Sequence, residues 1–275
     1  MSRSIGISGS TIMSAPEQIE NLFDYGVSHI EIGEFPDEEA FQKFLQLHNQ
    51  RHVTFGVHAP IYRSGSKNDL LQKVKFPPEV AWEQLEKEAK RLSSLGADYI
   101  LVHFPFLIHD LGEEGHQTLE QALRRLSDIQ RQHGIMIVCE PKLGVERSAL
   151  AIKTLQSLPI DTWGKYGLKL CIDVGDYALA TGDKFLDYLK KWRHYVKIVH
   201  LHNIEYRGDK YYWVPIHPSH EEDGQHVPLK AVIEQLSLSP DVVFVLEHTP
   251  HLNPGDAFVR EGLHWLQELL KMKPI

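Results

Sequence analysis

Residues able to bind a metal ion stand at the ends of several short apolar runs. The clearest case is the run 168–172, which ends in Asp173 and is followed by Gly175 and a second carboxylate, Asp176. A buried strand that presents a carboxylate at its carboxyl end and breaks on glycine is typical of the functional edge of an α/β barrel. The arrangement recurs along the chain, and the residues at the run ends are Glu31, His58, His103, Glu140, Asp173, His202 and Glu247.

These side chains predict a site for a divalent metal ion. Carboxylates and imidazoles crowded at one edge would repel each other or stay unsatisfied unless a cation neutralised them. We expect Glu140, Asp173, His202 and Glu247 to hold the ion, because each directly follows an apolar run and is fixed by a strand. Three carboxylates with one histidine suit Mn²⁺ best, with Zn²⁺ and Co²⁺ as alternatives.

Other candidates are secondary. Four residues could bind a second metal or the substrate, or simply support the first ligands through hydrogen bonds: His58, His103, Asp176 and His220. Glu31 is a weaker candidate for substrate binding. His200 lies two residues before His202, and we expect it one layer deeper in the barrel.

The elements that must position these residues alternate regularly. Eight apolar runs, each expected to be a strand, cover 4–8, 27–32, 53–57, 99–102, 135–138, 168–172, 196–201 and 242–246. Helix-like segments separate them, for example 15–25, 118–133 and 256–271, and this alternation predicts a parallel sheet with crossover helices. The 275 residues give about 34 per unit, which suits one strand plus one helix.

We therefore predict a single-domain α/β protein, a (β/α)8 barrel over residues 1–275. An open doubly wound sheet is the alternative, and the lack of a glycine-rich phosphate loop disfavours it.

The composition disfavours some classes of binding partner. The chain has 29 Lys and Arg against 37 Asp and Glu, a net charge of −8, which argues against a broad nucleic-acid interface. Only segment 62–75, with Arg63, Lys67, Lys73 and Lys75 against Asp69, offers local positive charge. The two cysteines lie in apolar runs, and no run approaches the roughly 18 residues of a membrane span. We expect a cytoplasmic protein that contacts no membrane; a homo-oligomer is left open.

Two connections, 59–77 and 203–228, are longer than usual and are candidates for a lid and for specificity. Aromatic and basic side chains in or near them could bind a sugar, namely Tyr62, Phe104, Arg207 and Trp213. Packing of the aromatic residues within a lid or at a subunit interface is the alternative.

At this point the motifs resemble those of the xylose isomerase-like TIM-barrel superfamily, which includes sugar phosphate isomerases/epimerases and family 2 AP endonucleases. The matching motifs are His58-Ala59-Pro60, Val102-His103-x-Pro105, Glu140, Asp173-Val174-Gly175, His200-Leu201-His202 and Glu247-x-Thr249-Pro250. In ketose epimerases of this group, the residues matching Glu140, Asp173, His202 and Glu247 hold one metal. The resemblance also implies that the two glutamates act as an acid/base pair.

The chain departs from the family pattern at two places. Asp176 stands where the family usually has histidine, and the loop after the seventh strand offers only His220 in place of the endonuclease Asp-x-His pair. Both departures weigh against a complete three-metal nuclease site. Glu140-Pro141-Lys142, in contrast, resembles the Glu-Pro-Lys of xylose isomerase, in which the lysine polarises the substrate carbonyl.

The resulting hypothesis is a divalent-metal-dependent sugar or sugar-phosphate isomerase or epimerase. It would act through a metal-stabilised ene-diolate, with Glu140 and Glu247 as the acid/base pair and Lys142 polarising the carbonyl. A surface position is the alternative for Lys142. The other functions left open are an endonuclease IV-like apurinic endonuclease, a cyclitol dehydratase and a non-catalytic sugar-binding barrel.

Overall fold

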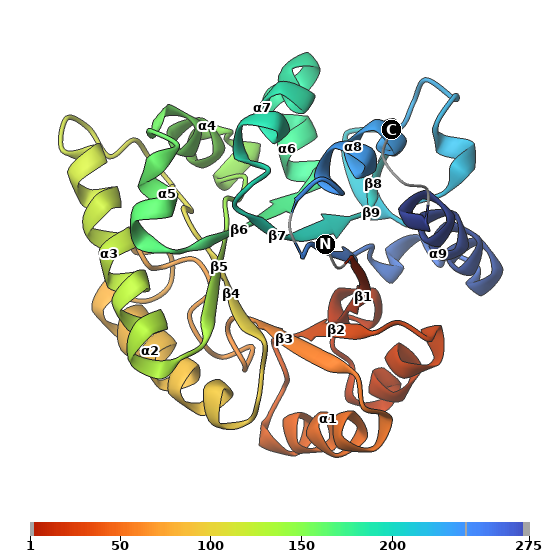
Figure 1. Ribbon diagram of the computed structural model, residues 1–275, viewed down its shortest axis with the longest axis horizontal. Helices are drawn as coiled ribbons and strands as arrows, with labels where there is room; N and C mark the ends of the chain where they lie inside the picture. The colour runs from red at the N-terminus through yellow and green to blue at the C-terminus, as the bar shows by residue number, and fades with distance from the viewer. Residues whose placement is uncertain (1–2, 240, 272–275) are drawn as a thin grey trace.

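Eight parallel strands close into a barrel in the computed structural model, which describes residues 3–239 and 241–271 (Figure 1). Around the barrel the strands follow the order β1-β10-β7-β6-β5-β4-β3-β2. Their bounds are β1 Ser4–Ser8, β2 His29–Ile32, β3 Thr54–His58, β4 Tyr99–His103, β5 Met136–Glu140, β6 Lys169–Asp173, β7 Val196–Leu201 and β10 Val243–Leu246. The predicted (β/α)8 barrel is confirmed.

The strands form where the sequence is nearly continuously apolar, because both faces of a barrel strand are covered. Every residue of β4 and of β10 is buried. Four strands end on the polar residue that follows the apolar run: His58, His103, Glu140 and Asp173. The register keeps neighbouring ends level, since His103 lies opposite Glu140 and Asp173 lies opposite His200.

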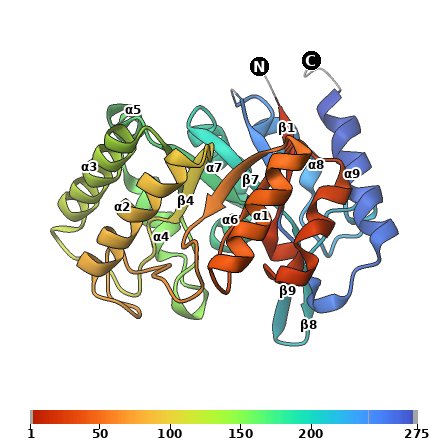
Figure 2. The ribbon, with the colours of Figure 1, turned by 90° about the horizontal axis from the view of Figure 1, so that it is seen from below.

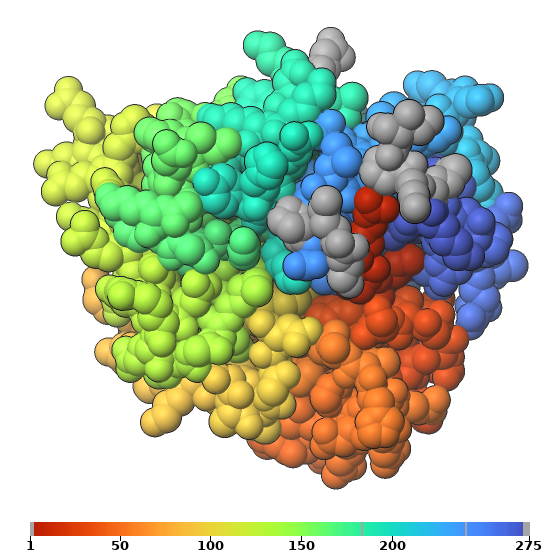
Figure 3. Space-filling model, in the orientation of Figure 1, coloured from red at the N-terminus to blue at the C-terminus, as the bar shows by residue number. Residues whose placement is uncertain are grey.

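Helices surround the barrel in chain order (Figure 1), and the colours follow the same order around the face seen in Figure 3. Their bounds are α1 Glu38–Arg51, α2 Pro78–Ser94, α3 Gly115–His133, α4 Leu150–Ser157, α5 Asp161–Tyr166, α6 Val174–Thr181, α7 Phe185–Trp192, α8 Leu229–Leu236 and α9 Asp256–Lys271. The short 3-10 segments are η1 Gly9–Ile12, η2 Pro16–Tyr25, η3 Val145–Arg147, η4 Gly182–Lys184, η5 Pro218–His220 and η6 Pro250–Leu252. The first helix-like segment of the sequence is thus a 3-10 helix, which stops at Gly26 in the left-handed conformation.

The two long connections are ordered. Residues 203–214 form an antiparallel hairpin of β8 (Asn203–Arg207) and β9 (Lys210–Val214), which projects beyond the barrel in Figure 2. In the other connection, the carboxylate of Asp69 accepts hydrogen bonds from the backbone N–H groups of Val74, Lys75 and Phe76. Among the described residues, no helix is long and apolar enough to cross a membrane.

Glu88 on α2 is a carboxylate buried beneath the 59–77 connection. Its Oε1 accepts hydrogen bonds from Ile61 N (3.2 Å) and from Gln84 Nε2 (2.9 Å). Within the described part of the chain, its Oε2 has no hydrogen-bond partner. Burial raises the pKa of Glu88 from 4.5 to about 7, because the ionised form is poorly solvated there. The folded protein therefore favours the protonated acid.

We expect Glu88→Gln to raise the free energy of unfolding at pH 8 by about 2–3 kcal/mol. The folded pKa lies above the unfolded value, so the wild type loses stability as the pH rises from 4.5 through about 7. A neutral amide carries no such penalty, and the two proteins should converge near pH 4.5. Urea unfolding at several pH values measures this difference. Glu83→Gln, on the exposed side of the same helix, is the control, and equal pH dependence of wild type and Glu88→Gln would contradict the prediction.

Candidate metal centre at the barrel mouth

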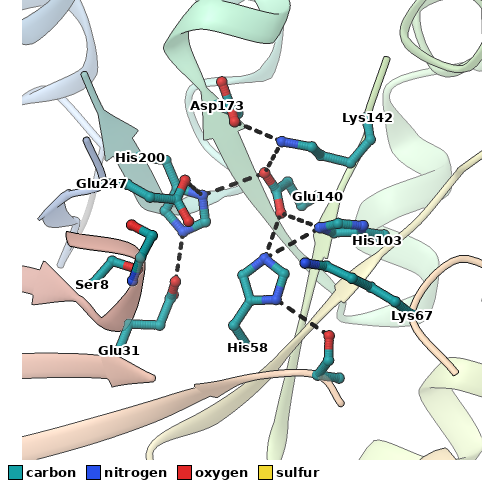
Figure 4. Close-up of polar contacts among 12 residues, drawn as sticks. Ser8, Glu31, His58, Lys67, His103, Glu140, Lys142, Asp173, His200 and Glu247 are labelled. Atoms are coloured by element: carbon teal, nitrogen blue, oxygen red, sulfur yellow. Dashed lines mark hydrogen bonds and ion pairs between the residues drawn. The ribbon is translucent and has the colours of Figure 1, made fainter. Parts of the chain in front are cut away.

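Four strands bring potential metal ligands to one point at the carboxyl end of the barrel. Glu140 on β5, Asp173 on β6, His200 on β7 and Glu247 after β10 each offer a ligand atom, and these atoms lie within 4.8 Å of one another (Figure 4). Glu140, Asp173 and His200 are buried, and Glu247 is partly exposed. Because neighbouring strand ends are level, residues that are far apart in the sequence meet here. Glu140 and Glu247, for example, are 107 positions apart.

His200 lies at the centre of this cluster. Its Nε2 is 2.8 Å from Glu31 Oε1, and its Nδ1 is 2.8 Å from Glu247 Oε2 and 3.3 Å from Glu140 Oε1. Burial alone would lower the pKa of His200, but the surrounding carboxylates raise it well above its ordinary value. The ring is therefore an imidazolium that joins three acids. Sequence reasoning left His200 out of the ligand set, although its two-residue spacing from His202 places both side chains on the same face of the strand.

His202, predicted as a ligand, contacts Asp173 but lies outside the group of four whose ligand atoms are within 4.8 Å of one another, where His200 takes its place. The His202 Nε2 lies 3.0 Å from Asp173 Oδ1, near the separation of about 3.0–3.4 Å that two ligands of one ion have. Among described residues its buried Nδ1 has no hydrogen-bond partner. The ring packs against Trp213, with 4.3 Å between the ring centroids. A Cβ atom on Gly175 would lie 2.4 Å from the His202 ring, so this contact requires glycine.

Lys142 points into the cluster and is not a surface lysine. Its ammonium lies 3.0 Å from Glu140 Oε1, 2.7 Å from Asp173 Oδ2 and 2.8 Å from Asp176 Oδ2. Burial would raise the pKa of Glu140, but Lys142 and His200 hold it well below its usual range. Burial and the neighbouring Asp173 raise the pKa of Asp176 to about 6. The Lys142 ammonium thus forms ion pairs with three carboxylates.

A second group of potential ligands shares Glu140. His58 Nε2 and His103 Nε2 lie 3.2 and 3.4 Å from Glu140 Oε2, and 3.2 Å from each other. Burial lowers the pKa of His103 well below its ordinary value, so this ring is neutral. Its Nδ1 lies 2.6 Å from Asn68 Oδ1 in the 59–77 connection, which fixes the ring orientation. A neutral, oriented imidazole beside a carboxylate is a competent metal ligand.

The charge balance of the cluster favours a divalent cation. The carboxylates that meet there are Glu31, Glu140, Asp173, Asp176 and Glu247. Lys142 and the imidazolium of His200 face them. Even with Asp176 protonated, the acids outnumber these cations, and buried negative charge of this kind is costly unless compensated. Carboxylates with imidazole suit Mn²⁺, Co²⁺ or Zn²⁺, so the residues fit the predicted ion.

The structure places several predicted residues outside the cluster. The Tyr62 hydroxyl contacts Glu38 and Arg91 on the outer side of the barrel. Arg207 is exposed at the hairpin turn, and Phe104 is buried in the apolar core. His220 stacks on His226, with 3.8 Å between ring centroids. Tyr62, Arg207 and His220 lie in the long connections that the sequence predicted. The direction of each side chain, however, depends on packing.

A cavity of about 820 Å³ opens beside the cluster. Glu247 and His58 form its inner end, and residues after β1, β2 and β3 form its walls. Among the candidate ligands, Glu247 and His58 line this cavity, whereas Glu140, Asp173, His200 and His202 are buried behind them.

Comparison with known proteins agrees with this architecture. The family model described as xylose isomerase-like TIM barrel matches residues 19–269. No curated protein matches the chain significantly.

Solved structures share the fold at low sequence identity. An L-ribulose 3-epimerase has a TM-score of 0.71 and 14% identity, with 98% of this chain and 95% of that chain covered. A 3-keto-D-glucoside 4-epimerase from E. coli has a TM-score of 0.65 and 13% identity, covering 97% and 100%. A family 2 AP endonuclease from Brucella melitensis has a TM-score of 0.65 and 14% identity, covering 96% and 98%.

We expect Lys142→Gln to lower the free energy of unfolding by about 3–5 kcal/mol in metal-free buffer, because three buried carboxylates lose their shared counter-charge. Added Mn²⁺ should stabilise the variant more than the wild type. Urea unfolding with EDTA and with MnCl2 measures both effects. Lys165→Gln removes an exposed lysine paired with Glu120 and is the control. A loss in EDTA no larger than that of the control would contradict the prediction.

Proposed function

We propose that this chain, which belongs to the xylose isomerase-like TIM barrel family, is a divalent-metal-dependent sugar or sugar-phosphate isomerase or epimerase. The observation that carries the proposal is the convergence of Glu140, Asp173, His200 and Glu247 beside the cavity, with His202 in contact with Asp173. The proposed enzyme is a single-domain cytoplasmic protein that acts on a small sugar. Its two cysteines, both free and buried, support a reducing compartment.

Four residues would hold the ion: Glu140, Asp173, His202 and Glu247. We prefer His202 to His200 as the imidazole ligand, because both ring nitrogens of His200 already bind carboxylates. Mn²⁺ is the first choice, with Zn²⁺ or Co²⁺ as alternatives. When bound, the ion would acidify the C–H next to the substrate carbonyl and stabilise the resulting ene-diolate.

Glu140 and Glu247 would form the acid/base pair. They come from strands separated by β6 and β7, and both approach Nδ1 of His200, which orients them toward a common space. Glu140 is ionised in the folded protein, because Lys142 and His200 hold its pKa well below the usual range. Glu247 lines the cavity and can reach the substrate from the other side.

Lys142 would bind the substrate oxygen that becomes negative. Its ammonium is held by Asp173 and Asp176, so it is fixed before substrate arrives. A preorganised cation in a water-poor site stabilises developing charge strongly. Trp213 would exclude water on the side of His202.

An apurinic endonuclease is the second candidate, and the additional ligand group of His58, His103 and Glu140 favours it. Its metals would activate water and bind phosphate. The basic segment gives it little support, because Lys67 pairs with Glu34 and the Arg63 guanidinium donates to backbone carbonyls. A cyclitol dehydratase would use the same ene-diolate chemistry.

We expect the purified protein to retain about one divalent ion per chain, measured by inductively coupled plasma mass spectrometry. Glu140→Gln and Asp173→Asn should lose the ion. Ketoses and aldoses incubated with the protein in deuterated water should exchange a C–H proton, detected by NMR. Glu247→Gln should slow this exchange about 10²–10⁴-fold, because a general acid/base is removed.

Glu83→Gln, on the exposed surface of α2, is the control for both measurements. Failure of every sugar to exchange, together with metal-dependent nicking of an abasic oligonucleotide, would replace the proposal with the endonuclease.

A further inference from the structure

The cavity beside the metal cluster has an outer part that the proposed chemistry does not use. It extends from Glu247 and His58 over the ends of β1, β2 and β3. The residues that line this outer part include Ser8, Ser10, Met13, Ser14, Glu34 and Lys67. At about 820 Å³, the cavity has room for a substrate that extends well beyond its reacting carbons.

Arg63 lines the cavity, but its guanidinium is occupied by hydrogen bonds to backbone carbonyls. Its Nε donates to Glu34 O at 2.8 Å, and its Nη2 donates to Met13 O at 2.5 Å and to Ser14 O at 3.3 Å. These three residues have left-handed backbones, with φ of 51°, 51° and 48° for Glu34, Met13 and Ser14. Non-glycine residues adopt this conformation only when the surroundings hold them there. The guanidinium therefore maintains the cavity wall.

Lys67, the other cation of the cavity, is paired. Its ammonium lies 2.9 Å from Glu34 Oε2, and both side chains are partly buried. Figure 4 shows Lys67 extending toward His58 and His103. The carboxylates Glu17 and Glu247 also line the cavity. Three carboxylates thus face two cations that already have partners, and a phosphate would have to compete with Glu34 for Lys67.

The remaining walls suit an uncharged ligand. Ser8 Oγ accepts a hydrogen bond from Ser10 N at 3.2 Å, so its own proton can be donated into the cavity. Met13 is 50% exposed and adjoins Ala15 and Pro16, which also line the cavity. Hydroxyl groups beside apolar contacts are typical of sites for neutral sugars.

We infer that the cavity takes the uncharged, hydroxyl-bearing end of an unphosphorylated sugar, and that the Glu34–Lys67 pair excludes sugar phosphates. This inference rests on the proposed function and narrows its substrate class. Glu34 is the specificity-determining residue, because it neutralises Lys67, which extends from the cavity wall toward His58 and His103.

The test compares ketoses with their own phosphates, for example D-fructose with D-fructose 6-phosphate and D-xylulose with D-xylulose 5-phosphate. The Mn²⁺-loaded protein is used in deuterated water for exchange and in calorimetry for binding. We expect the wild type to favour the free sugar by at least about tenfold in both. Glu34→Gln should shift this ratio toward the phosphate by about tenfold or more, because Lys67 loses its partner.

Two further variants make the result specific. Glu34→Gln combined with Lys67→Gln should lose the shift, since the ammonium that lines the cavity and could bind the phosphate is removed. Glu20→Gln breaks the exposed Glu20–Arg51 pair outside the cavity and should leave the ratio as in the wild type.

A wild-type preference for the phosphate, or an unchanged ratio in Glu34→Gln, would overturn the inference while leaving the proposed function intact. Absence of exchange with every sugar would instead count against the proposed function. Calorimetry then decides the inference by itself. Binding of the free sugar without its phosphate supports it, and binding of the phosphate or of neither sugar overturns it.

Discussion

Repulsion among buried carboxylates at the barrel mouth is the constraint on which this structure depends. Closing the barrel places five acids, which come from four strand ends and the start of α6, around one space, and each must find a positive or hydrogen-bonding neighbour. His200 and Lys142 supply positive charge from within the chain. The polar network continues into the barrel, where the Tyr99 hydroxyl donates to Glu31 Oε2 at 2.7 Å and lies 2.9 Å from His29 Nε2. Part of the barrel interior is therefore given over to holding the acids in place.

The two long connections are held against the site by hydrogen bonds. The backbone carbonyl of Trp213 accepts a hydrogen bond from the N–H of Thr249 at 3.0 Å, which ties the β8–β9 hairpin to the segment after β10. Asp69 gathers three backbone N–H groups, and the same connection carries Asn68 against His103. Hydrogen bonds of this kind to the backbone order the long loops and so define the positions of their side chains.

The sequence alone could predict the barrel and the polar strand ends, because alternating apolar and amphipathic segments dictate both. It could not predict that His200 of β7 reaches Glu31 of β2, since that contact crosses the interior and exists only after the barrel closes. Tyr62 and Arg207 lie in the expected connections, yet Tyr62 turns outward to Arg91 and Arg207 projects at the hairpin turn. Loop membership follows from the sequence, whereas side-chain direction follows from packing.

Lys142 contacts Glu140 and Asp173, two of the carboxylates that would also hold the proposed ion. The ammonium already bridges Glu140 and Asp173, so it is fixed within a cluster in which carboxylates outnumber cations. In the outer part of the cavity, Glu34 neutralises Lys67. The proposed substrate would place its carbonyl beside the Lys142 ammonium and the ion, and its neutral tail beside the Glu34–Lys67 pair. In the proposed reaction, the carbonyl would lie between Glu140 and Glu247, the two carboxylates that we propose as the acid/base pair.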